Sequence, residues 1–538
     1  MVFSSVIFFC YFLPIMIVGY YILPKKARNI WLLLGSLFFY AWGEPKYIFI
    51  MVASIVGNYV FGMLIHFFAL KEEHVFSNYE LKLAGEESSA DNAEGAGSNN
   101  MPHYSMTEGS AAKRITEVGT STGKKVTLII TILYNLGILF YFKYFNLFME
   151  TVNNVLHKNI SWVEVALPIG ISFYTFQGMS YVIDVYRGDC LPDRNGNRVE
   201  LVQKNPVNLA LYISMFPQLI AGPIVRYTDI KDSLKERITN ADTFSKGAER
   251  FIVGLAKKAI LANSIGEVAD KILGSDHMYM GASVAWLGAI CYTLQIYYDF
   301  SGYSDMAIGL GRIFGFEFLE NFNYPYISRS ITEFWRRWHI SLSSWFRDYL
   351  YIPLGGNRRG NVYVNLLIVF IATGIWHGAA WSFLIWGLWH GLFMLIERYF
   401  RKSGKPNPFA KLPSVLKWIY TMIIVSFGWI LFKLEDVPDT LSYIGAMFRL
   451  AGNRYTEFSV RYYLDNKMIV LLLIGIIACM PLGEVLPRHI GGRIVAFASA
   501  QPGRPACIVR RVLLIILLLI SMLFIVNSTY NPFIYFRF

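Results

Sequence analysis

Apolar runs of roughly membrane-spanning length recur along almost the whole chain. They cover residues 6–22, 30–42, 47–68, 126–145, 165–185, 209–224, 282–298, 362–376, 381–396, 418–432, 468–485 and 512–526. A helix needs about 20 residues to cross a bilayer, and helices satisfy their own backbone groups there. Hydrophobic residues make up 55% of the 538-residue chain and charged residues 16%, which a soluble domain does not show. We therefore predict an all-α polytopic membrane protein with roughly 10–12 transmembrane helices plus re-entrant segments.

Basic residues indicate the orientation. No basic residue precedes the first run, whereas Lys25, Lys26 and Arg28 follow it, so this run does not resemble a cleaved signal peptide. The positive-inside rule places residues 25–28, 398–417 and 488–511 in the cytoplasm, and the N-terminus and residues 531–538 outside. The formal net charge of +12 is thus explained by anchoring at membrane surfaces, and we predict no nucleic-acid partner.

One segment is not membrane-like. Residues 71–125 are expected to form a polar cytoplasmic loop, and residues 85–109, rich in Gly, Ser, Asn and Glu, to be disordered. This loop separates N-terminal transmembrane helices (1–70) from a core (126–400) and C-terminal transmembrane helices (401–538). Gly119 to Gly123 matches G-x-S-x-G, but the strand and helix that a nucleophile elbow needs are not predicted around it. The five cysteines form no C-x-x-C pair, so we predict no metal site.

Three histidines stand in or beside apolar runs: His339, His377 and His390. Ionisable residues at membrane depth are costly and mark functional sites, and imidazole is well suited to accept a proton from a hydroxyl at neutral pH. His377 has the most suggestive context, because Gly374 and Gly378 flank it and glycine permits close approach of backbone or ligand. A structural histidine is the alternative for each, and we favour it for His390.

His339 lies in a mixed segment that cannot face lipid and is therefore expected to line a cavity or re-enter the membrane. Arg347 and Asp348, nearby, are interpreted as a buried ion pair that holds this segment, with a functional role as the alternative. A further set of residues are candidates for lining the substrate path: Trp376, Trp338, Asp299 and Asp305. For the two aspartates, hydrogen bonds in helix packing are the alternative.

Several motifs together resemble the membrane-bound O-acyltransferase family, in its bacterial alginate O-acetyltransferase-like branch. The two longest are FWRRWHISLSSWFRDYLYIPLGG (334–356) and TGIWHGAAWSFLIWGLWHG (373–391), supported by LPIGISF (167–173), FPQLIAGP (216–223), QIYYDFSGYSD (295–305), NFNYP (321–325) and YNPFIYFRF (530–538). The resemblance implies helices around a central tunnel, with His377 as the catalytic residue and His339 as its polar partner.

The resemblance also implies substrates and partners. The donor is expected to be acetyl-CoA or another acyl thioester, reaching the tunnel from the cytoplasm, with no tightly bound cofactor. The acceptor is expected to be a hydroxyl of an exported polysaccharide, reached through an extracytoplasmic SGNH-hydrolase-like acetyltransferase. D-alanylation of teichoic acid and peptidoglycan O-acetylation are alternatives within the family. A secondary transporter is the alternative of another class, but it usually shows an internal repeat and we find none. The expected location is the bacterial inner membrane, in contact with its lipids.

Overall fold

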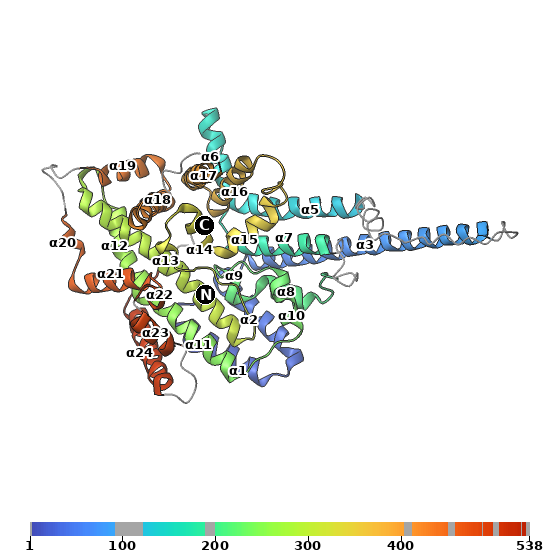
Figure 1. The fold of residues 1–538 in the computed structure, drawn as a ribbon, viewed down its shortest axis with the longest axis horizontal. Coiled ribbons are helices and arrows are strands. Elements are labelled where there is room, and N and C mark those ends of the chain that lie inside the picture. The colour runs from blue at the N-terminus through green and yellow to red at the C-terminus, as the bar shows by residue number, and fades with distance from the viewer. Residues whose placement is uncertain are drawn as a thin grey trace.

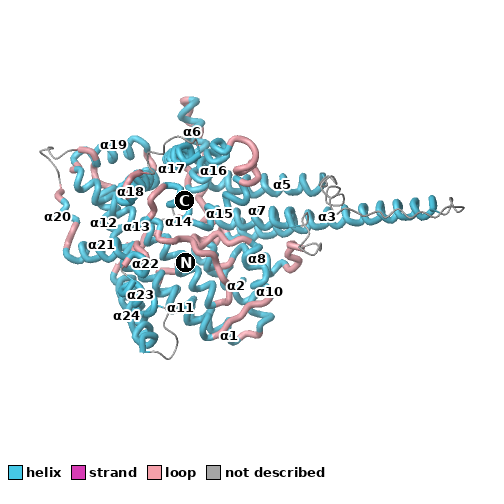
Figure 2. The backbone as a smooth tube through the Cα atoms, viewed as in Figure 1, coloured by secondary structure: helices cyan, strands magenta, loops and turns pink. Residues whose placement is uncertain are grey.

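The protein is helical throughout its described part. The computed structural model describes residues 3–91, 122–188, 200–402, 411–449, 458–486, 488–498, 505–528 and 530–533. Within these ranges the regular structure consists of helices joined by loops, and no strand occurs (Figures 1 and 2). The predicted all-α class is confirmed.

The N-terminal helices include a bundle of three neighbours, α3, α5 and α7, of which α3 projects far beyond the others (Figure 1). The elements are η1 (Phe8–Phe12), α1 (Leu13–Ile22), η2 (Lys25–Ala27), α2 (Arg28–Gly43), α3 (Ile48–Asp91), α5 (Thr122–Leu139), η3 (Phe140–Tyr144), α6 (Phe145–Leu156) and α7 (Ile171–Gly188). η1 and η3 are π-helical turns.

The segment predicted as a polar loop lies between α3 and α5. Residues 71–91 continue α3 and residues 122–125 belong to α5, so helix extends into both ends of the segment predicted as a polar loop over 71–125, disordered over 85–109; the loop stays a prediction. Propagating an existing helix costs little, and the Glu, Leu, Lys and Ala residues of this segment are good helix formers. Residues 92–121, with most of the expected disordered segment and the G-x-S-x-G match, lie outside the described residues.

The middle of the chain is organised around one long buried helix, α13. The elements are α8 (Pro206–Ser214), α9 (Phe216–Leu219), α10 (Tyr227–Lys235), α11 (Ala241–Ala256), η4 (Lys257–Ala262), α12 (Asn263–Leu273), η5 (His277–Tyr279), α13 (Ala282–Ile313) and η6 (Pro325–Ile327). α11 lies directly against α13 because glycines meet there: a Cβ on Gly254 would lie 2.6 Å from the carbonyl oxygen of Gly302. Because α13 extends from Ala282 to Ile313, the predicted apolar run 282–298 is only the first half of this helix.

In the C-terminal part, three short helical elements (α14, α15 and η7) lie between the long helices α13 and α16. The elements are α14 (Ile331–Arg337), α15 (Ile340–Phe346), η7 (Arg347–Tyr351), α16 (Val362–His377), α17 (Trp381–Lys402), α18 (Ser414–Lys433), α19 (Val437–Met447), α20 (Val460–Tyr463), α21 (Asn466–Ala478), α22 (Leu482–Val485), α23 (Arg488–Ala498) and α24 (Pro505–Asn527). α16 and α17 pair as a hairpin, and α18 packs on α17 and α13. The segment α14–α15–η7 is the mixed sequence that was expected to re-enter the membrane.

Four of the described helices are long and apolar enough to span a bilayer: residues 48–71, 122–156, 414–433 and 505–527. Shorter apolar helices cover residues 8–22, 362–377 and 466–478. These helices agree with a protein that crosses the membrane several times. The total of roughly 10–12 crossings stays a prediction.

Residues near both ends of the described chain are buried, as the exposed fractions of Phe3 and Phe533, 0% and 4%, show. The Asn531 amide donates to the Ser4 carbonyl at 3.2 Å, and Ser4 Oγ donates to Asn531 Oδ1 at 3.1 Å. Phe533 is buried and packs against Tyr303, with ring centroids 4.8 Å apart. Phe533 therefore belongs to the packed core.

Candidate active site

His377 is the last residue of α16, at the point where the chain leaves the helix. Gly378 follows in extended backbone, with φ −165° and ψ 164°. α16 and α17 pack closely at this end, because a Cβ on Gly374 would lie only 2.4 Å from the carbonyl oxygen of Phe383. The glycines beside His377 therefore serve the close pairing of α16 with α17. This pairing fixes the end of the helix that carries the imidazole.

The His377 ring is buried among aromatic side chains. Ring centroids lie 4.9 Å away for Trp376, 5.0 Å for Trp386 and 5.2 Å for Phe432. Within the described part of the chain its Nδ1 atom has no hydrogen-bond partner. A buried polar atom without a partner is costly, so this nitrogen is a natural contact for a substrate group.

His339 connects α14 to α15 in a strained conformation. Its φ of 46° and ψ of 54° are left-handed, which costs a residue other than glycine about 1–3 kcal/mol. The ring is held by a 3.0 Å hydrogen bond between Nδ1 and Asn321 Oδ1 and by an edge contact with Phe300, 4.6 Å between centroids. Nε2 is buried and has no partner among the described residues. Strain of this kind often marks a functional site.

The structure brings His377 and His339 together. Their ring centroids are 6.3 Å apart, although 38 positions separate the two residues in the sequence. The fold therefore places two imidazoles, one from the end of α16 and one from the connection between α14 and α15, beside each other.

His390 occupies a different environment. It is fully buried within α17, and its ring lies against Phe334, Trp335 and Trp386, with centroids 6.4, 5.2 and 5.3 Å away. Neither ring nitrogen has a hydrogen-bond partner within the described residues. Trp386 contacts both His377 and His390, while α16 and α17 are separate helices rather than one continuous helix. A structural role for His390 stays a prediction.

Of the two tryptophans expected near the tunnel, Trp376 lies closer to the histidines. Its ring centroid is 6.1 Å from that of His339 and 4.9 Å from that of His377. Trp338 packs instead with Trp429 at 4.6 Å and Phe334 at 5.6 Å, in an aromatic cluster beside the site. Contact with the substrate path stays a prediction for both.

The two aspartates of α13 are engaged in ion pairs. Asp299 pairs with Lys258 at 2.5 Å, and both side chains are 2% exposed. Asp305 pairs with Arg250 at 2.6 Å and Lys257 at 2.7 Å. These contacts tie α11 and η4 to α13, which favours the helix-packing alternative over a substrate path.

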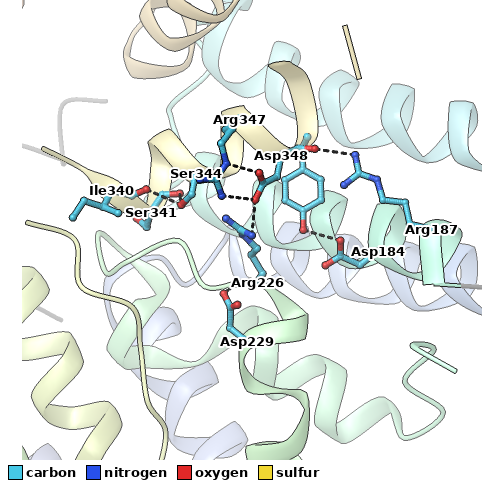
Figure 3. A network of polar contacts seen from close by, with 10 residues as sticks. Asp184, Arg187, Arg226, Asp229, Ile340, Ser341, Ser344, Arg347 and Asp348 are labelled. Atoms are coloured by element: carbon cyan, nitrogen blue, oxygen red, sulfur yellow. Dashed lines mark hydrogen bonds and ion pairs between the residues drawn. The ribbon is translucent and has the colours of Figure 1, made fainter. Parts of the chain in front are cut away.

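The ion pair of Arg347 and Asp348 forms, but it is not buried as expected. Arg347 Nε lies 2.6 Å from Asp348 Oδ1, yet the Arg347 side chain is 60% exposed. Asp348 also pairs with Arg226 at 2.7 Å, and its backbone carbonyl accepts a bond from Arg187 at 2.9 Å (Figure 3). The segment is therefore held by two arginines from elsewhere in the fold: Arg226, just before α10, binds the Asp348 carboxylate, and Arg187 of α7 binds its backbone.

Two residues of the site were not singled out from the sequence. Asn321, within the NFNYP motif, accepts bonds from His339 and from Ser341 Oγ at 2.9 Å and donates to Ser304 Oγ at 3.0 Å. Lys143 donates from its Nζ to the backbone carbonyls of Trp376 and His377. A signal for Lys143 was present, because it is the one charged residue in the apolar run 126–145.

Two cavities lie along α16 and α17, and neither His339 nor His377 is among the residues that line them. An apolar groove of about 840 Å³ between α5–α6, α7 and α16–α17 is bordered by Trp376 and Gly378. A second cavity, of about 440 Å³, lies between α14–α15–η7 and α16–α17 and contains Trp335 and Thr373. Four arginines line this second cavity, with no acidic residue among its lining: Arg336, Arg347, Arg398 and Arg401. We refer to it below as the arginine-lined cavity.

Comparison with known proteins decides the family. The profile of the membrane-bound O-acyltransferase family matches residues 138–434, which include the two histidines, Lys143 and Asn321. The chain belongs to this family. Three relatives match it over most of their length. "Probable alginate O-acetylase" of Pseudomonas putida is 36% identical over the whole of both chains, and its namesake in Azotobacter vinelandii is 35% identical over the whole of both. A peptidoglycan O-acetyltransferase of Helicobacter pylori is 32% identical over 84% of this chain and 80% of its own.

Membership of the O-acyltransferase family gives the site its chemical class. The protein is a membrane-bound O-acyltransferase, a multi-pass enzyme of the bacterial inner membrane. An O-acyltransferase has to remove a proton from a hydroxyl and supply an activated acyl group. The paired imidazoles, 6.3 Å apart by ring centroids, provide groups for proton transfer within the region that the family profile matches.

Proposed function

We propose that this enzyme moves an acetyl group from a cytoplasmic thioester to a hydroxyl on the outer side, for O-acetylation of an exported polysaccharide. The observation that carries the proposal is the pair His377 and His339, buried together with one unbonded nitrogen each. The names of the full-length relatives, probable alginate O-acetylases, support acetyl as the group and a polysaccharide as the final acceptor.

The chemistry requires one group that takes the proton and one that orients the acceptor. His377 takes the proton of the acceptor hydroxyl while the oxygen attacks the thioester carbonyl carbon. The Asn321 hydrogen bonds to Ser304 and Ser341 turn the Asn321 Oδ1 atom toward the His339 ring, so Nδ1 of His339 donates to Asn321. In the neutral ring Nε2 is then a hydrogen-bond acceptor, and through it His339 orients the acceptor.

The step is balanced without a further reactant. The new ester bond forms as the carbon–sulfur bond breaks, and the thiolate leaves with the proton that His377 returns. The products are the acyl ester and the free thiol. No metal or tightly bound cofactor is required by this sequence of events.

The arginine-lined cavity supports a donor that enters from the cytoplasm. Its arginines suit the phosphate groups of acetyl-CoA, because guanidinium groups bind phosphate through paired hydrogen bonds. Its inner residue Trp335 packs on Trp386 at 5.7 Å, and Trp386 contacts His377. We propose that the thioester arm of the donor lies along this side and that the phosphates remain at the arginines.

The acceptor side involves a partner in our proposal. The acetyl group passes to a separate extracytoplasmic, SGNH-hydrolase-like acetyltransferase, which modifies the polymer. The peptidoglycan O-acetyltransferase of Helicobacter pylori keeps peptidoglycan as a second candidate polymer. D-alanyl transfer to teichoic acid would need a different donor, which the assay below distinguishes.

The decisive experiment measures thioester consumption against ester formation in membranes that contain the full chain. Acetyl-CoA labelled in the acetyl group should be consumed in proportion to alkali-labile acetyl ester, and His377→Ala should abolish both at matched protein levels. Full retention of transfer by His377→Ala would refute the assignment of the base. Consumption of D-alanyl carrier protein but not acetyl-CoA would replace acetyl by D-alanyl.

A covalent route is tested in the same membranes. If the acetyl group resides on His377 before it reaches the acceptor, rapid acid quenching without acceptor should leave label on the protein, and His377→Ala should lose it. Absence of label on the wild-type chain under conditions of active transfer supports the direct route described above.

A further inference from the structure

A buried lysine supports the end of the helix that carries His377. Lys143 lies within the membrane-spanning segment 122–156, and its side chain is 6% exposed. Its Nζ donates to the carbonyl oxygen of His377 at 3.2 Å, to that of Trp376, and to Ser172 Oγ at 3.2 Å. All three bonds of the ammonium group are therefore made, and two of them go to the C-terminus of α16.

The ammonium group of Lys143 has no carboxylate to balance it. No Asp or Glu oxygen of the described residues lies within 4.0 Å of its Nζ, whereas the equally buried Lys258 pairs with Asp299 at 2.5 Å. A lone buried charge is costly in a membrane protein and is retained where it has a task. The groups that stabilise this one are helix-end carbonyls, which carry the negative end of the helix dipole.

The end of α16 has no cap of its own. Its last carbonyls lack intrahelical donors, and Gly378 is extended rather than left-handed, so the usual glycine cap is not formed. The cap comes instead from the π-helical turn η3. There Tyr144 donates to the carbonyl of Ile375, and Lys143 donates to the carbonyls of Trp376 and His377. A π-turn shifts the register of the residues that follow, and such turns are frequent at functional sites.

We propose that Lys143 is a positioning residue for acyl transfer, whose charged cap on α16 holds His377 in line with His339. This inference rests on the proposed function of His377. The carbonyl that Lys143 binds belongs to His377 itself, so a shift of the cap moves the imidazole directly. Displacement of a catalytic group by about 1 Å is enough to lower a rate by about 100-fold.

The test compares Lys143→Met, Lys143→Arg and the control Tyr144→Phe in the full chain, with labelled acetyl-CoA as donor. Lys143→Met, similar in length but uncharged, should lower kcat by about 10–100-fold and change the KM for acetyl-CoA by less than about 2-fold. Lys143→Arg, which keeps charge and donors, should recover most of the loss. Tyr144→Phe removes a neutral cap bond and should cost less than about 3-fold.

The outcomes separate a positioning role from a purely structural one. Equal losses in Lys143→Met and Lys143→Arg, or a kcat within 2-fold of wild type for a folded Lys143→Met, would overturn the proposal. If Lys143→Met does not accumulate, Lys143→Gln keeps neutral donors and takes its place; failure of both to fold would show that the residue serves folding and would also overturn the proposal. His377→Ala is measured in parallel, because its retention of activity would refute the proposed base independently of Lys143.

Discussion

His377 and His390 lie on neighbouring helices and both contact the ring of Trp386, with centroids 5.0 and 5.3 Å away. Both are at least 96% buried, so burial does not distinguish them. The difference is in their polar surroundings. His377 ends a helix, faces His339 and has its backbone carbonyl bound by Lys143, whereas His390 lies within a helix among aromatic rings.

This comparison supports the proposal of a catalytic role for His377 rather than for His390. A helix end leaves backbone groups that other side chains can bind, as Lys143 does at His377. Within a helix the neighbouring turns and the packed helices surround a side chain closely, as Gly428 illustrates: a Cβ there would lie 2.4 Å from His390 Nε2.

Among these variants, removal of the His339 imidazole, which lies beside His377, is expected to lower kcat the most. His339→Ala should lower kcat by about 100-fold, because the group that orients the acceptor beside His377 is lost. Donor consumption and ester formation should fall together. A variant that retains more than a tenth of the wild-type kcat would show that other residues orient the acceptor.

A smaller loss is expected from the residue behind His339. Asn321→Leu leaves the His339 ring without its 3.0 Å partner and should lower kcat by about 10-fold, the equivalent of about 1.4 kcal/mol. Ser304→Ala is the matched control, because it removes only the bond that Asn321 Nδ2 donates and leaves those that Oδ1 accepts; it should cost about 2-fold. If both variants lose equally, packing of the loop, rather than orientation of His339, determines the rate.

The smallest effect is expected at His390. His390→Leu keeps an apolar side chain in the aromatic pocket and removes two ring nitrogens that have no partner within the described residues, so transfer should stay within about 2-fold of wild type. Thermal unfolding in detergent should change little or show added stability. A loss as large as that of His339→Ala would erase the distinction between the two histidines.

The helical class could be predicted, and the two candidate histidines could be selected, because their signals are local. Apolar runs identify helices one at a time, and the two histidine motifs are each contiguous, as in TGIWHG around His377. Helix α3 extends past Lys71 into charged residues, where the sequence predicted a polar loop, because propagation of an existing helix costs little. The helices α11 and α12 were not predicted as separate elements, since their apolar positions alternate with charged ones and form no continuous run.

The partners of the charged residues could not be predicted for a different reason. Asp299 and Asp305 were equally compatible with a substrate path until α11 and η4 supplied Lys258, Arg250 and Lys257. Likewise Asp348 was assigned to its neighbour Arg347, yet Arg226, more than 100 positions earlier, lies at 2.7 Å. A sequence shows which buried charges need a partner of opposite charge, but it does not show which residue will be that partner.

The sequence alone determined that the chain is a helical membrane protein, that its family chemistry is acyl transfer and that His377 and His339 are the residues to examine, because hydropathy and motif are properties of adjacent residues. Only the tertiary structure decided that the two rings lie 6.3 Å apart and that Lys143 caps the helix of His377 from 233 positions away. The physical reason is that helix ends and buried charges are satisfied by whatever the fold brings to them, and that contact has no trace in the local sequence.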